Sequence, residues 1–165
     1  MDKNIVLIGM MGAGKTTVGK LLAQHLRRSF IDTDALIEKR EGRSIPDIFT
    51  QNGEDAFRAL ELKLSQELST SNGLIIACGG GLPLRPDCIG PLKDSGTVVF
   101  LNRDPGEIYD SVSMAGRPLG QGGREDFLAR FAQREPIYRK WADHVVNSLS
   151  TPAATVDAIL AALDL

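Results

Sequence analysis

The stretch Gly9-Met10-Met11-Gly12-Ala13-Gly14-Lys15-Thr16 decides how this chain folds. It follows an apolar run at residues 5–8 and opens an amphipathic helical pattern, which is the context that a phosphate-binding loop requires. Its glycines let the backbone curl around an anion, and the helix that begins there adds a partial positive charge. The stretch therefore predicts a site for a nucleoside triphosphate; a glycine-rich turn without a ligand is the alternative.

The side chains of this loop have distinct predicted roles. Lys15 supplies a positive charge for the outer phosphates, and the Thr16 hydroxyl is a hard oxygen ligand suited to Mg²⁺. The residues expected to bind the nucleotide are Gly12, Ala13, Gly14, Lys15, Thr16 and Thr17. No Asn is followed by Lys, so the guanine-reading motif Asn-Lys-x-Asp is absent and ATP is the expected nucleotide. Met10 and Met11 are interpreted as loop filler.

The rest of the chain alternates between strand and helix patterns. Short apolar runs at residues 5–8, 30–31, 74–78, 97–101 and 145–146 predict five buried strands. Two apolar helical faces lie between strands: Val18, Leu21, Leu22 and Leu26, and further on Phe57, Leu60, Leu64 and Leu68. This alternation predicts an α/β fold, with a five-stranded parallel sheet flanked by helices.

Two helix starts and two interruptions complete the pattern. Asp104 before Pro105, and Thr151 before Pro152, each place a capping side chain ahead of a proline suited to the first helical position. Residues 34–53 and the Gly- and Arg-rich residues 116–124 do not fit the alternation. We expect both to be mobile elements that cover a substrate.

Length, composition and charge exclude several other classes. The 165 residues are the length of one domain, so we expect residues 1–165 to form a single unit. A net charge of −2 argues against a general nucleic-acid binder. Cys78 and Cys88 are too few and too loosely spaced for a disulfide framework or a zinc site. No apolar run approaches the roughly 18 residues that cross a bilayer, so a cytoplasmic protein without a membrane partner is expected. The size and the unexceptional composition make a monomer the default expectation.

Two carboxylates mark the acceptor side of the predicted site. Asp32 and Asp34 come just after a buried strand, at the sheet edge where parallel α/β folds bind ligands. One carboxylate near Thr16 can hold the waters of Mg²⁺, and the other can accept the proton of a substrate hydroxyl. We assign Asp32 to the metal and Asp34 to the substrate; the alternative is that these acids only cap the following helix.

Glycines and arginines indicate an anionic acceptor. Gly79, Gly80 and Gly81 follow another buried strand, where they let the backbone approach a ligand that side chains would block. Arg58, Arg117 and Arg134 have unusual contexts, and guanidinium groups bind carboxylate and phosphate in bidentate fashion. Arginines that converge with Asp34 would suit a polyhydroxy acid; solvated surface arginines and a simple tight turn are the alternatives.

At this point the residues resemble the shikimate kinase family. The resemblance spans nearly the whole chain and rests on the order and spacing of these motifs: Gly-Met-Met-Gly-Ala-Gly-Lys-Thr-Thr-Val-Gly, Asp32-Thr33-Asp34, Gly42-Arg43-Ser44-Ile45, Gly53-Glu54-x-x-Phe57-Arg58-x-x-Glu61, Gly79-Gly80-Gly81, Arg117-Pro118-Leu119 and Arg134-x-Pro136-x-Tyr138. It implies a three-layer P-loop kinase fold, with a substrate-binding insertion at about residues 33–61 and a lid at about residues 112–124.

The resemblance also implies an activity and a set of roles. The activity is transfer of the γ-phosphoryl group of ATP to the 3-hydroxyl of shikimate, with Mg²⁺, in the pathway to chorismate and the aromatic amino acids. By position, Asp34 would deprotonate that hydroxyl, and Lys15 and Arg117 would stabilise the moving charge. Arg58, Arg134 and the backbone of residues 79–81 would hold shikimate. Arg117 would also contact the phosphates, and adenine would rest against the loop that ends at Pro152.

Two departures and two other functions accompany this interpretation. Gly120 stands where the family commonly has an apolar residue, and Asp110 where an adenine-stacking Arg often sits. A gluconate kinase of the same fold would share the phosphate loop but would not need these arginine and glycine contacts. A non-catalytic ATP-binding module would tolerate changes at Asp34, Arg58 and Arg134.

Overall fold

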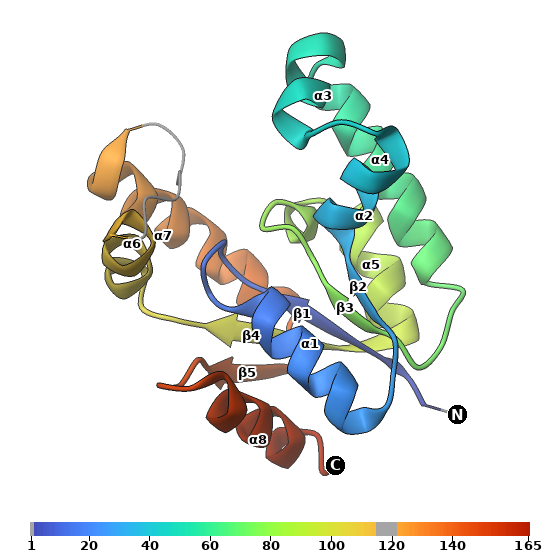
Figure 1. The fold of residues 1–165 in the computed structure, drawn as a ribbon, viewed down its shortest axis with the longest axis vertical. Helices are drawn as coiled ribbons and strands as arrows, with labels where there is room; N and C mark the ends of the chain where they lie inside the picture. The colour runs from blue at the N-terminus through green and yellow to red at the C-terminus, as the bar shows by residue number, and fades with distance from the viewer. Residues whose placement is uncertain (1, 115–121) are drawn as a thin grey trace.

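Five strands form one parallel sheet in the order β2-β3-β1-β4-β5 (Figure 1). They are β1 (Asn4–Ile8), β2 (Phe30–Asp32), β3 (Ile75–Ala77), β4 (Gly96–Asn102) and β5 (His144–Asn147). The computed structural model describes residues 2–114 and 122–165. All five strands occur where the apolar runs predicted them, and each neighbouring pair is parallel, which confirms the predicted fold class.

Helices cover both faces of this sheet, which gives the three layers expected. They are α1 (Lys15–Leu26), α2 (Thr33–Glu41), α3 (Ile45–Asn52), α4 (Glu54–Leu68), the short 3₁₀ helix η1 (Leu82–Leu84), α5 (Pro86–Ser95), α6 (Pro105–Met114), α7 (Gly123–Trp141) and α8 (Pro152–Ala162). Helices α1 and α8 pack together on one face, and α5 and α7 lie on the other. Helices α2, α3 and α4 form an arm that projects beyond the sheet (Figure 1).

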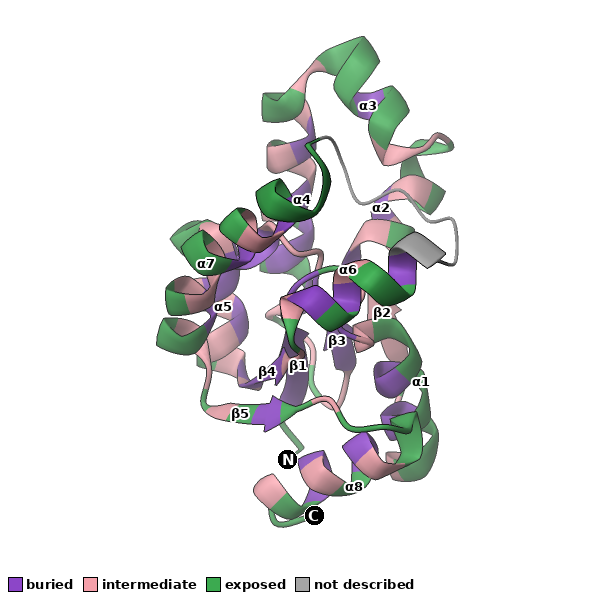
Figure 2. Cartoon of the chain, turned by 90° about the vertical axis from the view of Figure 1, so that its left-hand side faces the viewer, coloured by how far each residue is buried: buried purple, intermediate pink, exposed green. Residues whose placement is uncertain are grey.

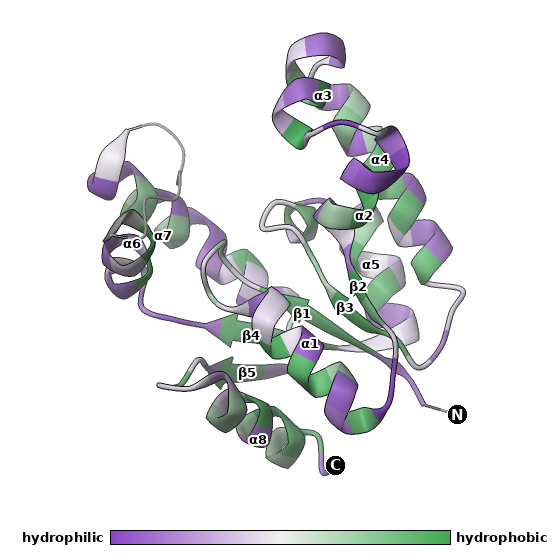
Figure 3. Cartoon of the chain, in the orientation of Figure 1, coloured by the Kyte–Doolittle hydropathy of each residue, from purple (hydrophilic) through white to green (hydrophobic). Residues whose placement is uncertain are grey.

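The core is centred on β1, β3 and β4. Figure 3 shows these strands as a hydrophobic band, and Figure 2 shows that they are buried while most of α3 is exposed. The register places Ile5 opposite Ile75 on one side and opposite Thr97 on the other. Of the apolar face predicted for α1, Val18 and Leu22 are buried, whereas Leu21 is 37% exposed.

Both predicted helix starts are confirmed. The Asp104 carboxylate accepts a hydrogen bond from the Glu107 N–H at 2.9 Å, and the Thr151 hydroxyl accepts one from the Ala154 N–H at 3.1 Å. These bonds satisfy backbone donors that have no partner inside the helix. The sequence patterns did not locate α5 or α7, because each contains an internal proline, Pro91 and Pro136, that argues against a helix.

Several features expected from the sequence lie outside the described residues. Arg117 and Gly120, and most of the lid expected at residues 112–124, fall in this part of the chain. Helices α6 and α7, which flank it, pack against each other. Over the residues that are described, no helix combines the length and the apolar character needed to cross a membrane.

Candidate active site

The phosphate-binding loop joins β1 to α1 through three glycines in the left-handed region. Their φ angles are +148° at Gly9, +84° at Gly12 and +97° at Gly14. A Cβ atom at Gly9 would lie 2.7 Å from the carbonyl oxygen of Leu101, and one at Gly12 would lie 2.7 Å from Ile108 Cγ2. Both the backbone conformation and the close neighbours therefore require glycine at Gly9 and Gly12.

Lys15 is the first residue of α1, and its ammonium group folds back over this loop. Its Nζ donates hydrogen bonds to the carbonyl oxygens of Gly9 at 2.5 Å and Met10 at 2.9 Å. Burial lowers the pKa of Lys15 to about 8, although the neighbouring carboxylates of Asp34 and Asp32 act in the opposite direction. The lysine therefore still carries its charge at neutral pH.

The two methionines of the loop have different surroundings. Met11 is 45% exposed and lines the cavity described below. Met10 is only 2% exposed, and the Tyr138 hydroxyl contacts its sulfur at 3.7 Å. The interpretation of Met10 as loop filler was therefore wrong, because its side chain anchors the loop against α7.

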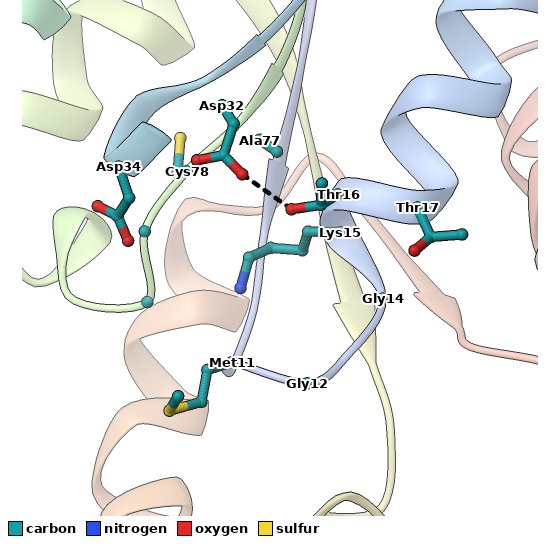
Figure 4. A pocket seen from close by; sticks show the side chains of 12 residues that line it. Met11, Gly12, Gly14, Lys15, Thr16, Thr17, Asp32, Asp34, Ala77 and Cys78 are labelled. Atoms are coloured by element: carbon teal, nitrogen blue, oxygen red, sulfur yellow. Dashed lines mark hydrogen bonds between the residues drawn. The ribbon is translucent and has the colours of Figure 1, made fainter. Parts of the chain in front are cut away.

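Asp32 stands at the end of β2 and has two partners. Its Oδ2 accepts a hydrogen bond from the Thr16 hydroxyl at 2.8 Å (Figure 4). Its Oδ1 accepts one from the Ala35 N–H at 3.1 Å. Asp32 is thus the residue that caps α2. The capping role considered for both acids is therefore confirmed for Asp32 only, and Asp34 lies in the first turn of α2.

A cavity of about 230 Å³ lies between the phosphate-binding loop and the ends of β2 and β3. Figure 4 shows Lys15, Asp32, Asp34 and the Thr16 hydroxyl around it. Burial raises the pKa of Asp34 to about 6, and the nearby carboxylates of Glu61 and Asp32 add to the effect against the opposing charge of Lys15. A carboxylate with a pKa near 6 is a stronger base than an exposed one, yet it is ionised at neutral pH.

The glycine turn after β3, residues 79–81, lies beside three side chains predicted to bind the acceptor substrate: Asp34, Arg58 and Arg134. A Cβ atom on Gly79 would lie 2.5 Å from Asp34 Oδ1, one on Gly80 would lie 3.2 Å from Arg134 Nη1, and one on Gly81 would lie 3.1 Å from Arg58 Nη1. The structure therefore brings Asp34, Arg58 and Arg134 together around the turn.

Two buried side chains hold this turn in place. The Thr33 hydroxyl accepts a hydrogen bond from the Gly79 N–H at 3.0 Å, and the Tyr138 hydroxyl donates one to the Gly80 carbonyl at 2.7 Å. Both side chains are fully buried. Sequence reasoning assigned no role to either residue, although both belong to quoted motifs, because each acts on backbone far away in the sequence.

Arg58 is held by Glu61, another residue to which the sequence analysis assigned no role. Its Nη1 donates to Glu61 Oε1 at 2.6 Å, and Glu61 is only 1% exposed. Burial raises the pKa of Glu61, while the guanidinium of Arg58 acts in the opposite direction. Their spacing of three residues along one helix could have indicated this ion pair, because it places the two side chains on the same face.

A second, larger cavity adjoins the other side of the phosphate-binding loop. Its volume is about 600 Å³. It is lined by Ala13, Gly14, Thr17, Val18, Arg103, Glu107, Ser148, Leu149, Ser150, Pro152 and Thr155. Gly14 and Thr17 line both cavities, so the two meet at the start of α1. The loop that ends at Pro152, against which the adenine is expected to rest, lines this cavity.

The oxygen donors near this junction fit Mg²⁺. The Thr16 hydroxyl oxygen and Asp32 Oδ2 lie 2.8 Å apart, beside the phosphate-binding loop. Within residues 2–114 and 122–165, no group of three or more His, Cys, Asp or Glu side chains could hold a metal ion. Mg²⁺ commonly takes one or two protein oxygens and completes its shell with water and substrate phosphates, so this sparse donor set suits it.

Comparison with known proteins agrees with this geometry. The family model described as shikimate kinase matches residues 11–164. A shikimate kinase of Pelotomaculum thermopropionicum is 43% identical over 149 residues, which cover 88% of this chain and 86% of that protein. A structure of shikimate kinase from Acinetobacter baumannii in complex with shikimate has a TM-score of 0.86 at 35% identity, and the match covers 99% of this chain and 94% of that one.

A structure of a gluconokinase from Sinorhizobium meliloti is more distant. It has a TM-score of 0.63 at 18% identity, over 98% of this chain and 91% of that one, so it shares the fold alone. The family model, by contrast, covers almost the entire chain, and the identity to curated relatives is well above the level at which only folds are shared. This chain belongs to the shikimate kinase family.

Proposed function

We propose that this chain transfers the γ-phosphoryl group of ATP to the 3-hydroxyl of shikimate, which gives shikimate 3-phosphate and ADP for the synthesis of aromatic amino acids. The observation that supports it best is the convergence of Asp34, Arg58 and Arg134 on the glycine turn beside the phosphate-binding loop. One carboxylate base and two guanidinium groups match an acceptor that carries hydroxyls and one carboxylate.

ATP would occupy both cavities. Its phosphates would lie along the backbone of residues 12–17, with Lys15 and Arg117 near the outer phosphates, and its adenine would lie in the 600 Å³ cavity beside Pro152. Thr16 and Asp32 would hold Mg²⁺, directly or through water, and when bound the ion would neutralise charge on the phosphates.

Asp34 would act as the general base. The 3-hydroxyl oxygen of shikimate forms a bond to the γ-phosphorus, the bond from that phosphorus to the bridging oxygen of ADP breaks, and the hydroxyl proton passes to the Asp34 carboxylate. Arg58 and Arg134 would bind the substrate carboxylate and so orient the hydroxyl.

Because all assigned residues belong to one chain, a monomer suffices. We infer a cytoplasmic location from the use of ATP.

The acceptor can be identified by measuring ADP release with ATP and Mg²⁺ in the presence of shikimate, gluconate or a nucleoside monophosphate. We expect turnover only with shikimate. Replacing Arg134 by Ala removes one charged hydrogen-bond donor and should raise KM for shikimate about 10- to 100-fold. Arg139→Ala is the matched control, because Arg139 lies on the same helix but is exposed and pairs with Glu135 at 3.2 Å.

The outcomes separate the competing functions. Turnover with gluconate in place of shikimate would keep the nucleotide site and discard the proposed acceptor. ADP release that is slow and indifferent to every acceptor would instead favour a non-catalytic ATP-binding module.

The contact between Gly79 and Asp34 gives a further prediction. In Gly79→Ala, the new Cβ atom would lie 2.5 Å and 2.8 Å from the two carboxylate oxygens of Asp34, so the carboxylate must move. Displacing a reacting group by about 1 Å can cost on the order of 100-fold in rate, and we expect kcat to fall by about that factor. The measurement is steady-state kinetics together with thermal unfolding.

Gly90→Ala is the control for this substitution. Gly90 lies in α5, and a Cβ atom there would meet nothing within 4 Å. We expect Gly90→Ala to leave kcat unchanged. A Gly79→Ala enzyme with the kcat of the wild type would show that Asp34 tolerates displacement and would argue against its role as the base.

A further inference from the structure

Arg103 makes a long-range contact with the phosphate-binding loop that no sequence motif indicated. It follows β4 directly, and its Nη1 donates a hydrogen bond to the carbonyl oxygen of Gly12 at 3.0 Å. The two residues are 91 positions apart. The side chain is partly buried and lines the 600 Å³ cavity together with Ala13, Gly14 and Thr17.

This bond orients one peptide unit of the loop. Because a trans peptide is planar, the Gly12 carbonyl and the Ala13 N–H point in opposite directions from the same plane. The Ala13 N–H donates to the Met10 carbonyl at 3.2 Å, and that oxygen also accepts from Lys15 Nζ at 2.9 Å. Arg103 and Lys15 are thus linked through the Gly12–Ala13 peptide and the Met10 carbonyl, which accepts from both Ala13 and Lys15.

Gly12 is held by a second contact as well. Its Cα faces Ile108 and Val112 of α6, so closely that a Cβ atom would lie 2.7 Å and 3.1 Å from their methyl groups. Gly12 therefore contacts both the apolar side chains of α6 and the guanidinium of Arg103. Two contacts restrict the conformations that this part of the loop can adopt, and preorganisation of this kind favours binding.

The charge of Arg103 is available to an anion. Glu107 lines the same cavity, yet among the described residues no carboxylate lies close enough to Arg103 to form an ion pair. Its hydrogen-bond partner is the neutral carbonyl oxygen of Gly12, which does not cancel the positive charge. The guanidinium therefore adds to the attraction that the loop and Lys15 exert on a polyphosphate.

We propose that Arg103 is a positioning residue for the nucleotide: it fixes the Gly12–Ala13 peptide within the phosphate-binding loop and supplies positive charge to the adjoining cavity. The inference rests on the proposed placement of ATP in that cavity. It does not depend on the identity of the acceptor.

The test is the affinity for ADP with Mg²⁺, measured by titration calorimetry, in Arg103→Met and Arg103→Lys. Methionine keeps much of the side-chain length but removes both donor and charge, so we expect ADP affinity to fall about tenfold, the scale of one charge-assisted hydrogen bond. Lysine keeps the charge and one donor and should recover part of the loss. At saturating ATP, KM for shikimate should not change.

Arg28→Met is a closely matched control. Arg28 Nη1 also donates to a backbone carbonyl, that of Lys3, at 3.0 Å, but it lies away from both cavities. Arg28→Met should bind ADP as the wild type does. ADP affinity within twofold of the wild type in Arg103→Met would overturn the inference, and so would an equal loss in Arg28→Met. Failure of the proposed acceptor would appear separately, as a wild type that binds ADP without turning over shikimate.

Discussion

Replacing Asp34 by Asn is expected to lower kcat by about 10²- to 10⁴-fold, the usual contribution of a positioned general base. The amide has nearly the same shape as the carboxylate but cannot accept the proton of the substrate hydroxyl. The carboxylate faces Gly79, and burial raises its pKa to about 6, so it is ionised and basic at neutral pH. The measurement is steady-state kinetics with shikimate and ATP, with circular dichroism as the check on folding.

The pH dependence of kcat/KM distinguishes this role from a structural one. Asp34 must be deprotonated to act as a base, so activity in the wild type should fall as the pH drops through about 6. The residual activity of Asp34→Asn should lack this acidic limb. Asp157→Asn, a change at an exposed position of α8, should keep both the rate and the limb. Persistence of the acidic limb in Asp34→Asn would assign the titration to another group.

Replacing Lys15 by Met should lower kcat/KM by about 10²- to 10³-fold, which is typical for the loss of one preorganised donor to a developing negative charge. Met preserves much of the side-chain volume and removes the ammonium. In the structure Nζ donates to the carbonyl oxygens of Gly9 and Met10, which places the charge at the loop itself. The same kinetic assay measures the effect.

Two observations test whether the charge of Lys15 is responsible. Burial lowers its pKa to about 8, and the ammonium form is the active one, so kcat/KM in the wild type should fall as the pH rises through about 8. This alkaline limb should be absent in Lys15→Met. Lys20→Met changes an exposed lysine on the same helix and should behave as the wild type. A loss of similar size in Lys20→Met would point to a general effect on α1.

Patterns between residues close in sequence predicted much of the fold. The loop at residues 9–16 and the five apolar runs identified the strands correctly, because a buried parallel strand needs a continuous apolar run. The capped starts of α6 and α8 were also correct. Helices α5 and α7 were missed because each contains a proline, an exception that tertiary packing tolerates.

The site was predicted less completely, because its residues meet through contacts between segments that are far apart in the sequence. Asp34, Arg58 and Arg134 could be identified by residue type and motif, but their meeting at the glycine turn could not be derived from spacing. Met10 was misread because nothing near it in sequence shows that it packs against Tyr138, 128 positions away. Asp32 rather than Asp34 caps α2, a choice that depends on where the helix begins.

The sequence by itself determined that this chain has a phosphate-binding loop after its first strand, a parallel α/β sheet, and acidic and basic side chains suited to phosphoryl transfer. These properties follow from local geometry and residue chemistry. Only the tertiary structure decided which groups meet: Thr33 with Gly79, 46 positions apart, Tyr138 with Gly80, 58 apart, and Arg103 with Gly12, 91 apart. Such contacts depend on how helices pack on the sheet, and no periodicity along one segment records that packing.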